Sequence, residues 1–310
     1  MDYKSFVEQQ ILSIRETVGD GLAINALSGG VDSSVVTVLG HRALGDRLKT
    51  VFIDNALMRE GEPQQVMHAM ADMCIPVEVV DARRDFLQAL AGVTDPEAKR
   101  NAVTQTFYKK VFGDLVRQSG AKYLLHGTIL TDIEETVAGI KRQHNILAQL
   151  GIDPQQAYGY HVLEPLETLR KDGVREVARL LGLPPGLARR MPFPGPALAT
   201  RIVGEVTEER LATVRAATAI VEEELAGMNV FQYLAVLLND KATGIRDGKR
   251  EFGQIIVVRC VDSVDARIAT AVEVPWEKLN RISARITAIP GVNRCLYDLT
   301  PKPPATIEYV

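Results

Sequence analysis

Apolar residues in the first part of the chain alternate between short continuous runs and stretches with helical spacing. Residues 3–18 place Phe6, Ile11, Leu12 and Ile14 at helical spacing, which predicts an amphipathic helix with these side chains towards a core. Short apolar runs that predict buried strands follow at 22–27, 50–53, 76–80, 122–126 and 161–163, and helical patterns cover 64–72, 96–118 and 172–181. Because short strands alternate with helices, the pattern predicts an α/β fold with a doubly wound parallel sheet.

The alternation ends in a stretch that is rich in proline. Pro184 and Pro185 are followed by Met-Pro-Phe-Pro-Gly-Pro at 191–196, which fits neither a helix interior nor a central strand. We therefore predict one domain over residues 1–188 and another over 189–310. Beyond the boundary, helical patterns cover 207–225 and 275–289, and strand-like runs cover 231–238, 254–262, 268–274, 294–299 and 306–309. The second domain is thus predicted to be a smaller α+β unit.

Composition and charge narrow the class of protein. The 310 residues are 46% hydrophobic and 24% charged, which is typical of a soluble globular protein of two domains. The net charge of −3 gives no basic field for nucleic acid. Three cysteines without metal-ligand spacing predict a cytoplasmic protein without disulfides. We expect no membrane association, because no apolar segment is long enough to span a bilayer.

The most informative stretch is Leu-Ser-Gly-Gly-Val-Asp-Ser-Ser at 27–34, directly after the first predicted strand. Glycines let backbone N–H groups converge, and such amides at a helix N-terminus bind phosphate oxygens. Ser28, Ser33 and Ser34 add hydroxyl donors, and Asp32 adds a carboxylate of the kind that binds Mg²⁺. An ordinary capped turn would use similar residues. The strand–turn–helix context favours a site for a nucleotide's phosphate chain.

This stretch lacks the Gly-Lys-Ser/Thr ending of the P-loop of kinases and GTPases. It resembles instead the SGGxDS signature of the PP-loop ATP pyrophosphatases, which have an adenine nucleotide alpha hydrolase-like fold. The resemblance implies that Ser28, Gly29, Gly30, Val31, Asp32, Ser33 and Ser34 hold the pyrophosphate part of ATP, with Mg²⁺. Asp54, Gly127 and Thr128 follow other predicted strands and would face the same crevice. Asp54 would serve equally well as a helix N-cap.

Further segments resemble one family within that group, the GMP synthases. They are residues 51–59, 90–100, 126–129, 164–166, the linker 191–196 and the C-terminal run 297–308. The chain is similar over nearly its whole length to the synthetase subunit of the two-polypeptide archaeal type. This resemblance implies that ATP adenylates the C2 oxygen of xanthosine monophosphate (XMP) and that ammonia then displaces AMP to give GMP. It also implies a separate glutamine amidotransferase subunit and a homodimer formed through the C-terminal domain.

The same resemblance points to residues around the phosphates. Lys141 and His144 lie in a segment similar to the family's lid and are catalytic candidates together with Asp32. A solvated lysine and a structural histidine are the alternatives. Asp132 and Glu135 are candidate metal ligands beside Asp32, although acidic residues on a loop are often only solvated.

The acceptor site is expected in the C-terminal domain. Arg201 and Lys302 are the candidates for the XMP phosphate, because arginine grips phosphate with parallel donors and lysine adds a point charge. Thr306, the backbone of Ile307 and Glu308 are the candidates for the purine. A frayed C-terminus is the alternative interpretation of this tail.

Two other functions stay open at this point. The chain is also compatible with a diverged PP-loop ligase that adenylates another acceptor, and with a nucleotide-binding protein that has lost turnover. An assay for AMP and pyrophosphate release with ATP, Mg²⁺, XMP and ammonium distinguishes the three.

Overall fold

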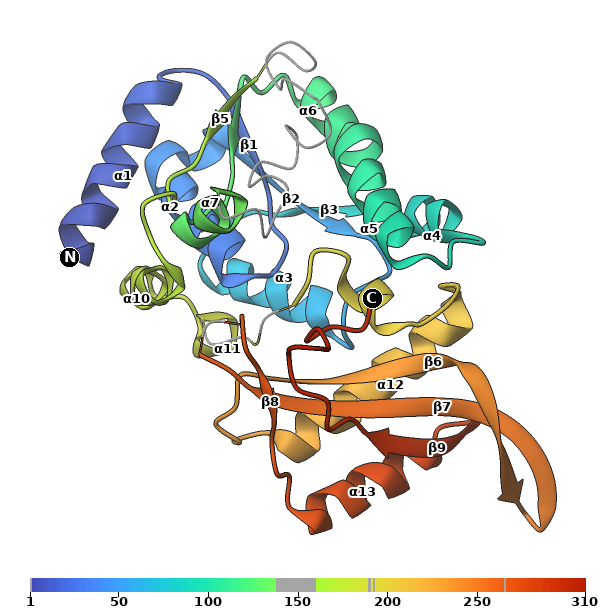
Figure 1. Cartoon of the computed structure of the whole chain (residues 1–310). Coiled ribbons are helices and arrows are strands. Elements are labelled where there is room, and N and C mark those ends of the chain that lie inside the picture. The colour runs from blue at the N-terminus through green and yellow to red at the C-terminus, as the bar shows by residue number, and fades with distance from the viewer. Residues whose placement is uncertain (1, 138–159, 189–190, 192, 265) are drawn as a thin grey trace. The chain divides into compact units, whose positions relative to one another are not determined.

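The computed structural model describes residues 2–137, 160–188, 191, 193–264 and 266–310, which fold into two compact units (Figure 1). The first unit comprises Met1–Asp54, Gly61–Ala82 and Thr104–Arg190. The second comprises Asn55–Glu60, Arg83–Val103 and Met191–Val310. The second unit therefore includes two segments from within residues 1–188, where the sequence predicts the N-terminal domain.

The first unit is built on a parallel sheet of five strands. The strands are β1 (Ala23–Ala26), β2 (Leu48–Asp54), β3 (Glu78–Asp81), β4 (Tyr123–Leu125) and β5 (His161–Leu163), in the order β3-β2-β1-β4-β5. The predicted α/β fold with a parallel sheet is confirmed. The strand order reverses between β1 and β4, and ligands of such sheets bind at the carboxyl ends of the strands beside this switch point.

Helices surround this sheet. They are α1 (Tyr3–Val18), α2 (Val31–Leu44), η1 (Gly45–Arg47), α3 (Glu62–Asp72), the π-helical η2 (Thr106–Phe112), α6 (Gly113–Ser119), α7 (Leu130–Val137), α10 (Lys171–Leu181) and α11 (Pro185–Ala188). Helix α2 approaches the sheet closely at Gly40, because a Cβ there would lie 2.6 Å from Leu125 and 2.8 Å from Leu48. Only glycine allows this distance without a shift, so the helix that follows the glycine turn sits directly on the strands.

The first helix has the predicted bounds, and two of its four predicted core residues, Phe6 and Ile14, are buried. Phe6, Val7, Ile14 and Val18 are buried, whereas Leu12 is 51% exposed. The assignment of Leu12 to the core was wrong. Leu12 follows Val7 by five residues, which places it about 140° around a helix of 3.6 residues per turn.

The second unit contains a four-stranded sheet with helices. Its elements are α4 (Arg83–Leu90), α5 (Pro96–Gln105, which ends in the first unit), η3 (Ala197–Arg201), α12 (Glu208–Leu225), β6 (Gln232–Arg246), β7 (Lys249–Asp262), β8 (Thr270–Ala271), α13 (Trp276–Thr287) and β9 (Val292–Tyr297). Strand β7 pairs antiparallel with β6 and β8 and parallel with β9. The predicted α+β unit is confirmed.

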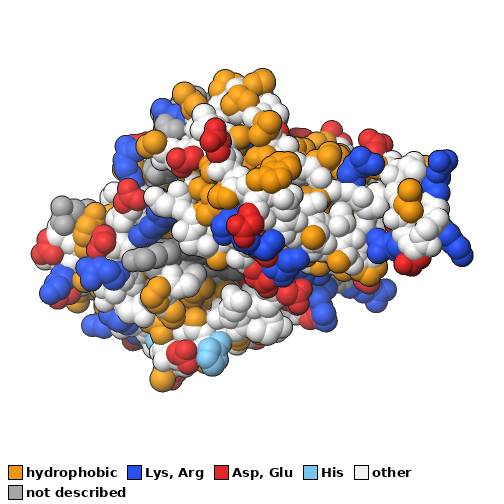
Figure 2. All heavy atoms as spheres, turned by 90° about the horizontal axis from the view of Figure 1, so that it is seen from below, with side chains coloured by type: hydrophobic (Ala, Val, Ile, Leu, Met, Phe, Trp, Pro, Cys, Tyr) orange, Lys and Arg blue, Asp and Glu red, His pale blue; other side chains and the backbone are white. Residues whose placement is uncertain are grey.

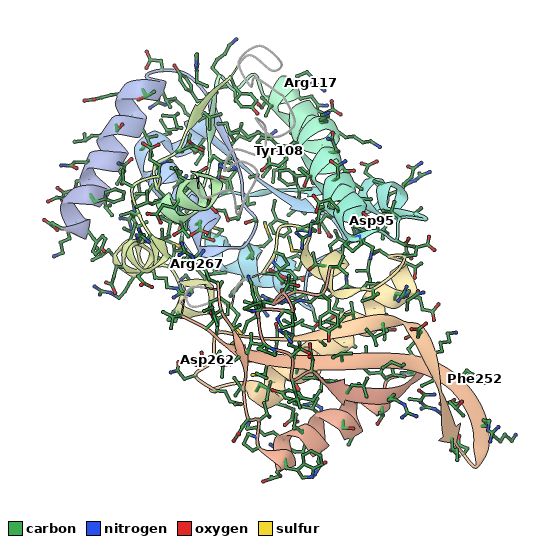
Figure 3. All side chains as sticks on the ribbon, viewed as in Figure 1. Asp95, Tyr108, Arg117, Phe252, Asp262 and Arg267 are labelled. Carbon is green, nitrogen blue, oxygen red and sulfur yellow. The ribbon has the colours of Figure 1, made fainter. Side chains whose placement is uncertain are left out.

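Strands β6 and β7 extend well beyond their predicted ends and form a hairpin, on which Phe252 lies (Figure 3). The hairpin turns at Asp247 and Gly248, whose φ values of 51° and 74° are both left-handed. Asp-Gly is the strongest short-range signal for such a two-residue turn. The sequence carried this signal, but the polar residues on both sides of it hid the strands.

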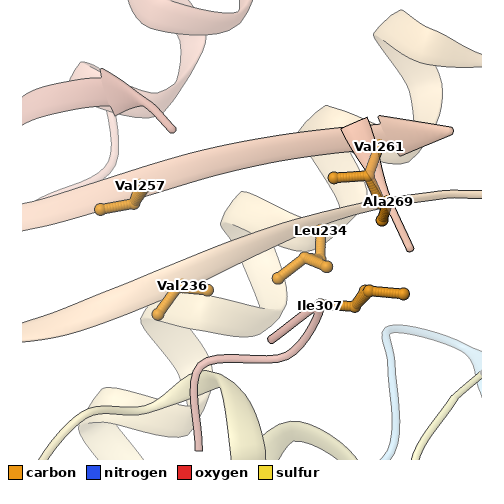
Figure 4. Close-up of a cluster of buried hydrophobic side chains, with 6 residues drawn as sticks. All are labelled: Leu234, Val236, Val257, Val261, Ala269 and Ile307. Atoms are coloured by element: carbon orange, nitrogen blue, oxygen red, sulfur yellow. The ribbon is translucent and has the colours of Figure 1, made fainter. Parts of the chain in front are cut away.

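The C-terminal tail packs into the core of the second unit instead of forming the strand predicted at 306–309. Ile307 is 8% exposed and lies in one apolar cluster with strand residues (Figure 4). The cluster comprises Leu234, Val236, Val257, Val261, Ala269 and Ile307. Burial of this side chain, together with side-chain hydrogen bonds such as that from Arg259 to the Thr306 carbonyl, holds the tail in place without a strand.

Charges of both signs are interspersed on the face of the molecule shown in Figure 2, as the net charge of −3 leads one to expect. Among the described residues, no helix has the length and apolar character that a membrane span requires.

Candidate functional site

The glycine turn, residues 27–34, joins β1 to α2 in the predicted strand–turn–helix context. Gly29 has a φ of +78°, a conformation that favours glycine. Gly30 is the N-cap of α2, and no side chain occupies the cap position. Ser33 ties the turn together, because its hydroxyl accepts from the backbone N–H of Ser28 at 3.2 Å and donates to the carbonyl of Gly30 at 3.1 Å. Ser34 also donates to that carbonyl, at 2.9 Å.

Asp32 stands in the first turn of α2 and contacts a lysine that sequence reasoning missed. Nζ of Lys171, the first residue of α10, donates to Oδ2 of Asp32 at 2.6 Å. The other carboxylate oxygen, Oδ1, is buried and has no hydrogen-bond partner. The sequence shows that a lysine precedes the helix predicted at 172–181, where its charge opposes the helix dipole, but it does not identify the partner.

The segment after β4 lies against the glycine turn. A Cβ on Gly127 would be 3.3 Å from the backbone nitrogen of Ser33, so the two backbones approach closely. Thr128 is 2% exposed and donates its hydroxyl proton to Glu164. Nδ1 of His126 lies 2.8 Å from the same hydroxyl oxygen. Because the hydroxyl has only one proton, His126 is the donor in that pair.

The remaining candidates of the first unit occupy different places. Asp54 ends β2, and its carbonyl accepts from Ala82 at 2.9 Å; the next helix along the chain has Gly61 as its N-cap. Oδ2 of Asp132 accepts from the backbone N–H of Ile129 at 3.1 Å, which is one half of a capping box at the start of α7. Glu135 lies on the same helix. Lys141 and His144 lie outside the described residues, among which no group of three or more His, Cys, Asp or Glu side chains could hold a metal ion by itself.

In the second unit, the structure brings two predicted acceptor residues together. Arg201 is fully buried and donates to both carboxylate oxygens of Glu308, at 3.2 and 3.1 Å. Gln232 also donates to Glu308, at 2.7 Å. Nη1 of Arg201 is buried without a hydrogen-bond partner. The guanidinium groups of Arg201 and Arg59 lie 4.9 and 4.0 Å from the centre of the Phe193 ring. This arrangement leaves an unsatisfied cationic donor inside the unit.

The other acceptor candidates belong to an ordered tail. Nζ of Lys302 donates to the carbonyl of Ala266 at 2.8 Å. Arg259 is fully buried, pairs with Asp298 at 2.6 Å and donates to the carbonyl of Thr306 at 3.1 Å. The alternative of a frayed C-terminus is therefore wrong for this tail. A second buried arginine, which sequence reasoning did not single out, sets the course of the backbone at Thr306.

Lys99 of α5 is a buried cation next to this region. It is 1% exposed, and Nζ donates to the carbonyl of Ile202, the residue after Arg201, at 2.6 Å. Burial, the largest cause, and the positive charge of Arg210 together lower the pKa of Lys99 to about 8, and Asp95 partly offsets both effects. Lys99 is therefore still mostly a cation at neutral pH, but it loses its proton at a lower pH than an exposed lysine does.

Comparison with known proteins gives consistent matches over the full length. The chain is 51% identical over 310 residues to a glutamine-hydrolysing GMP synthase subunit of Archaeoglobus fulgidus, with 100% of both chains covered. It is 49% identical over 313 residues to the protein of the same name from Pyrococcus horikoshii, again with 100% of both covered. The family model described as GMP synthase C terminal domain matches residues 219–309.

Among solved structures, NMN synthetase from Francisella tularensis has a similar fold. The two chains superpose with a TM-score of 0.50 at 15% sequence identity, over 68% of this chain and 84% of the other. At this identity the likeness concerns the fold alone.

Proposed function

The chain belongs to this family of glutamine-hydrolysing GMP synthase subunits, and we propose that it catalyses the ATP-dependent amination of XMP to GMP. In this reaction the C2 oxygen of XMP attacks the α-phosphorus of ATP and pyrophosphate leaves. This adenylation turns the C2 oxygen from a poor leaving group into a good one. Ammonia then adds at C2, its nitrogen loses a proton, and AMP departs. The observation that carries the proposal is the glycine turn at the switch point of the sheet, with the buried Oδ1 of Asp32 beside it. The identity of about 50% over the full length to GMP synthase subunits does not favour the two alternatives, a ligase for another acceptor and a nucleotide-binding protein without turnover.

The glycine turn would hold the two phosphates that leave as pyrophosphate. The amides of Gly29, Gly30 and the first turn of α2 supply donors, and the developing negative charge is stabilised by donors fixed in advance. Asp32 fits a Mg²⁺ ion, because its Oδ1 is buried without a donor and such ions bind one or two carboxylates plus phosphates. The ion would neutralise phosphate charge. Lys171 balances the remaining charge of Asp32.

The acceptor would be held by the second unit. Nη1 of Arg201 is a buried donor without a partner, and the phosphate of XMP is an anion that would satisfy it. Glu308 holds the fork of Arg201 and has the oxygens to accept from a purine N–H group. Lys302 adds a cation from the ordered tail. Arg201 would thus bind the phosphate of the nucleotide, and Glu308 would accept from N–H groups of its base.

The relatives are each named as one subunit of a glutamine-hydrolysing enzyme, so a separate polypeptide that hydrolyses glutamine is the partner that supplies ammonia. We also propose a homodimer formed through the second unit. Ile245 and Phe252 are 80% and 71% exposed on the hairpin, where a second copy would cover them. A reducing cytoplasm suits the exposed free thiol of Cys74.

The deciding experiment measures AMP and pyrophosphate release by the purified chain with ATP, Mg²⁺, XMP and ammonium. The proposal requires release that depends on XMP and that falls by about a hundredfold or more in Asp32→Asn, as expected when a group that stabilises transition-state charge is lost. Release with another acceptor alone, or nucleotide binding without release, contradicts it.

A further inference from the structure

A chain of buried hydrogen bonds links the centre of the first sheet to the glycine turn. Thr50 of β2 and Asn25 of β1 are partners in register, and the Thr50 hydroxyl donates to Oδ1 of Asn25 at 2.8 Å. Nδ2 of Asn25 donates to Oγ1 of Thr37 at 2.6 Å, and Thr37 donates to the carbonyl of Ser33 at 2.8 Å. Asn25, Thr37 and Thr50, which we call the polar relay, are 1%, 0% and 3% exposed.

The direction of every bond in the polar relay is fixed by its last member. A backbone carbonyl only accepts, so the single hydroxyl proton of Thr37 is committed to Ser33. Thr37 must then accept from the amide nitrogen of Asn25, which turns the amide oxygen towards Thr50. All three bonds therefore point towards α2, and bonds aligned in this way polarise one another in a low-dielectric interior.

The residues of the polar relay are polar at buried positions where apolar side chains are usual. Strand β1 lies between β2 and β4, and strands at the centre of a parallel sheet are normally continuous apolar runs. Asparagine is depleted in strands. Apolar side chains of similar shape would fill the same interior and would leave no polar group in need of a partner. These three residues therefore call for a role other than burial.

The polar relay ends at the residue on which the glycine turn closes. Besides accepting from Thr37 through its carbonyl, Ser33 accepts through Oγ from the N–H of Ser28 and donates to the carbonyl of Gly30. A shift of the Ser33 backbone would therefore disturb the contacts of Ser33 with both Ser28 and Gly30. We propose that Asn25, Thr37 and Thr50 are positioning residues that hold the glycine turn in the geometry that binds the phosphates of ATP. This inference rests on the proposed function of the turn.

The test replaces the polar relay by apolar side chains of similar shape. In the triple variant Asn25→Leu, Thr37→Val, Thr50→Val, no orphaned polar group remains. We expect KM for ATP and Kd for inorganic pyrophosphate to rise about threefold to tenfold, the effect of one hydrogen bond, with KM for XMP unchanged. The single variant Asn25→Leu leaves the Thr50 hydroxyl without its acceptor and the Thr37 hydroxyl without its donor, and it should show the same rise together with a lower Tm.

Thr213→Val in α12 is the matched control, because Thr213 is also buried and donates to a carbonyl four residues earlier, that of Glu209, at 3.1 Å. It should leave KM for ATP unchanged. If the triple variant does not fold, Thr37→Val alone breaks the last link, keeps the bond between Asn25 and Thr50, and gives the same readout.

The outcomes separate the polar relay from the proposed function. Wild-type affinity for pyrophosphate and wild-type KM for ATP in the triple variant overturn the positioning role, as does an equal rise in KM for both substrates. A wild-type chain that binds pyrophosphate but releases no AMP with XMP contradicts the proposed function, and pyrophosphate affinity still decides the role of the polar relay. A wild-type chain that binds no pyrophosphate overturns both.

Discussion

Nζ of Lys171 lies 2.6 Å from Oδ2 of Asp32, which joins the first residue of α10 to the second residue of α2. The two side chains are 41% and 26% exposed, so the pair is only partly shielded from water. The contact matters because Asp32 is the acidic residue of the glycine turn. One oxygen of its carboxylate is occupied by the lysine, and the other has no hydrogen-bond partner.

Replacing Lys171 tests whether the lysine and a cation share Asp32. In Lys171→Met the carboxylate loses its only described cation, and we expect the free energy of unfolding to fall by about 1 kcal/mol without Mg²⁺, with part of this loss restored by added Mg²⁺. Chemical unfolding with and without MgCl₂ measures both effects. Arg170→Met is the control, because Arg170 is the preceding residue and pairs with Glu134. Equal responses of wild type and Lys171→Met to Mg²⁺ would count against a shared site.

Replacing Lys302 tests the acceptor site. Lys302→Ala removes a point charge from the ordered tail, and we expect KM for XMP to rise about tenfold, the loss of one charge-assisted hydrogen bond, with KM for ATP nearly constant. Initial rates of AMP release at varied XMP and at varied ATP give the two constants. Lys278→Ala is the matched control, since Lys278 likewise donates to a backbone carbonyl, that of Glu224. Equal changes in the two constants would remove Lys302 from the acceptor site.

Lys99 gives the fold a specific dependence on pH. Its folded pKa of about 8 lies below the usual 10.5, so between these values the unfolded chain binds a proton that the folded chain has lost. Stability from this group therefore rises with pH in that window, by up to about 1.4 kcal/mol per pH unit. Unfolding of wild type and Lys99→Met at pH 7.5 to 10 tests this, because the difference should shift in favour of the wild type as pH rises. A difference that stays constant would show that Lys99 has an ordinary pKa.

The proposed homodimer predicts a change of mass on removal of the exposed apolar residues of the hairpin. Light scattering after gel filtration should give twice the 34.0 kDa of one chain for the wild type, and a mass near that of one chain for Ile245→Ser, Phe252→Ser. Val79→Ser serves as the control, because Val79 is also an exposed apolar residue, at 52%, but belongs to the first unit. A monomeric wild type would contradict the homodimer, and a dimer that survives in the double variant would place its interface elsewhere.

Sequence patterns located all five strands of the first sheet, where the apolar runs predict them. Burial explains this for the inner strands β1, β2 and β4, which are largely buried, because such strands are rich in apolar residues. The edge strands β3 and β5 are exposed or half-buried, although they too were predicted from short apolar runs. Only the outer part of the hairpin was missed, because its residues near Asp247 and Gly248 are exposed or at most half-buried and include few apolar side chains. Leu12 was assigned to the core for the opposite reason, as hydrophobic character alone does not fix the face of a helix.

The candidate site was predictable only as far as local motifs reach. The glycine turn is a single continuous stretch, so its strand–turn–helix form followed from sequence. Lys171 lies 139 residues away from Asp32, and Arg259 is 47 residues from the Thr306 carbonyl that it binds. Such pairs depend on how distant elements pack, and one sequence without the fold does not reveal them.

The chain passes between the two units several times, which limits how its gene can recombine with others. Residues 55–60 and 83–103 belong to the second unit although strands of the first unit flank them in sequence. Arg215 of α12 anchors the earlier segment through the carbonyls of Ala56 and Met58, at 2.6 and 2.9 Å. A gene cut at the proline linker would separate these segments from their partners. The two units can therefore be exchanged between proteins only as a single piece, and recombination at the linker would yield two incomplete folds.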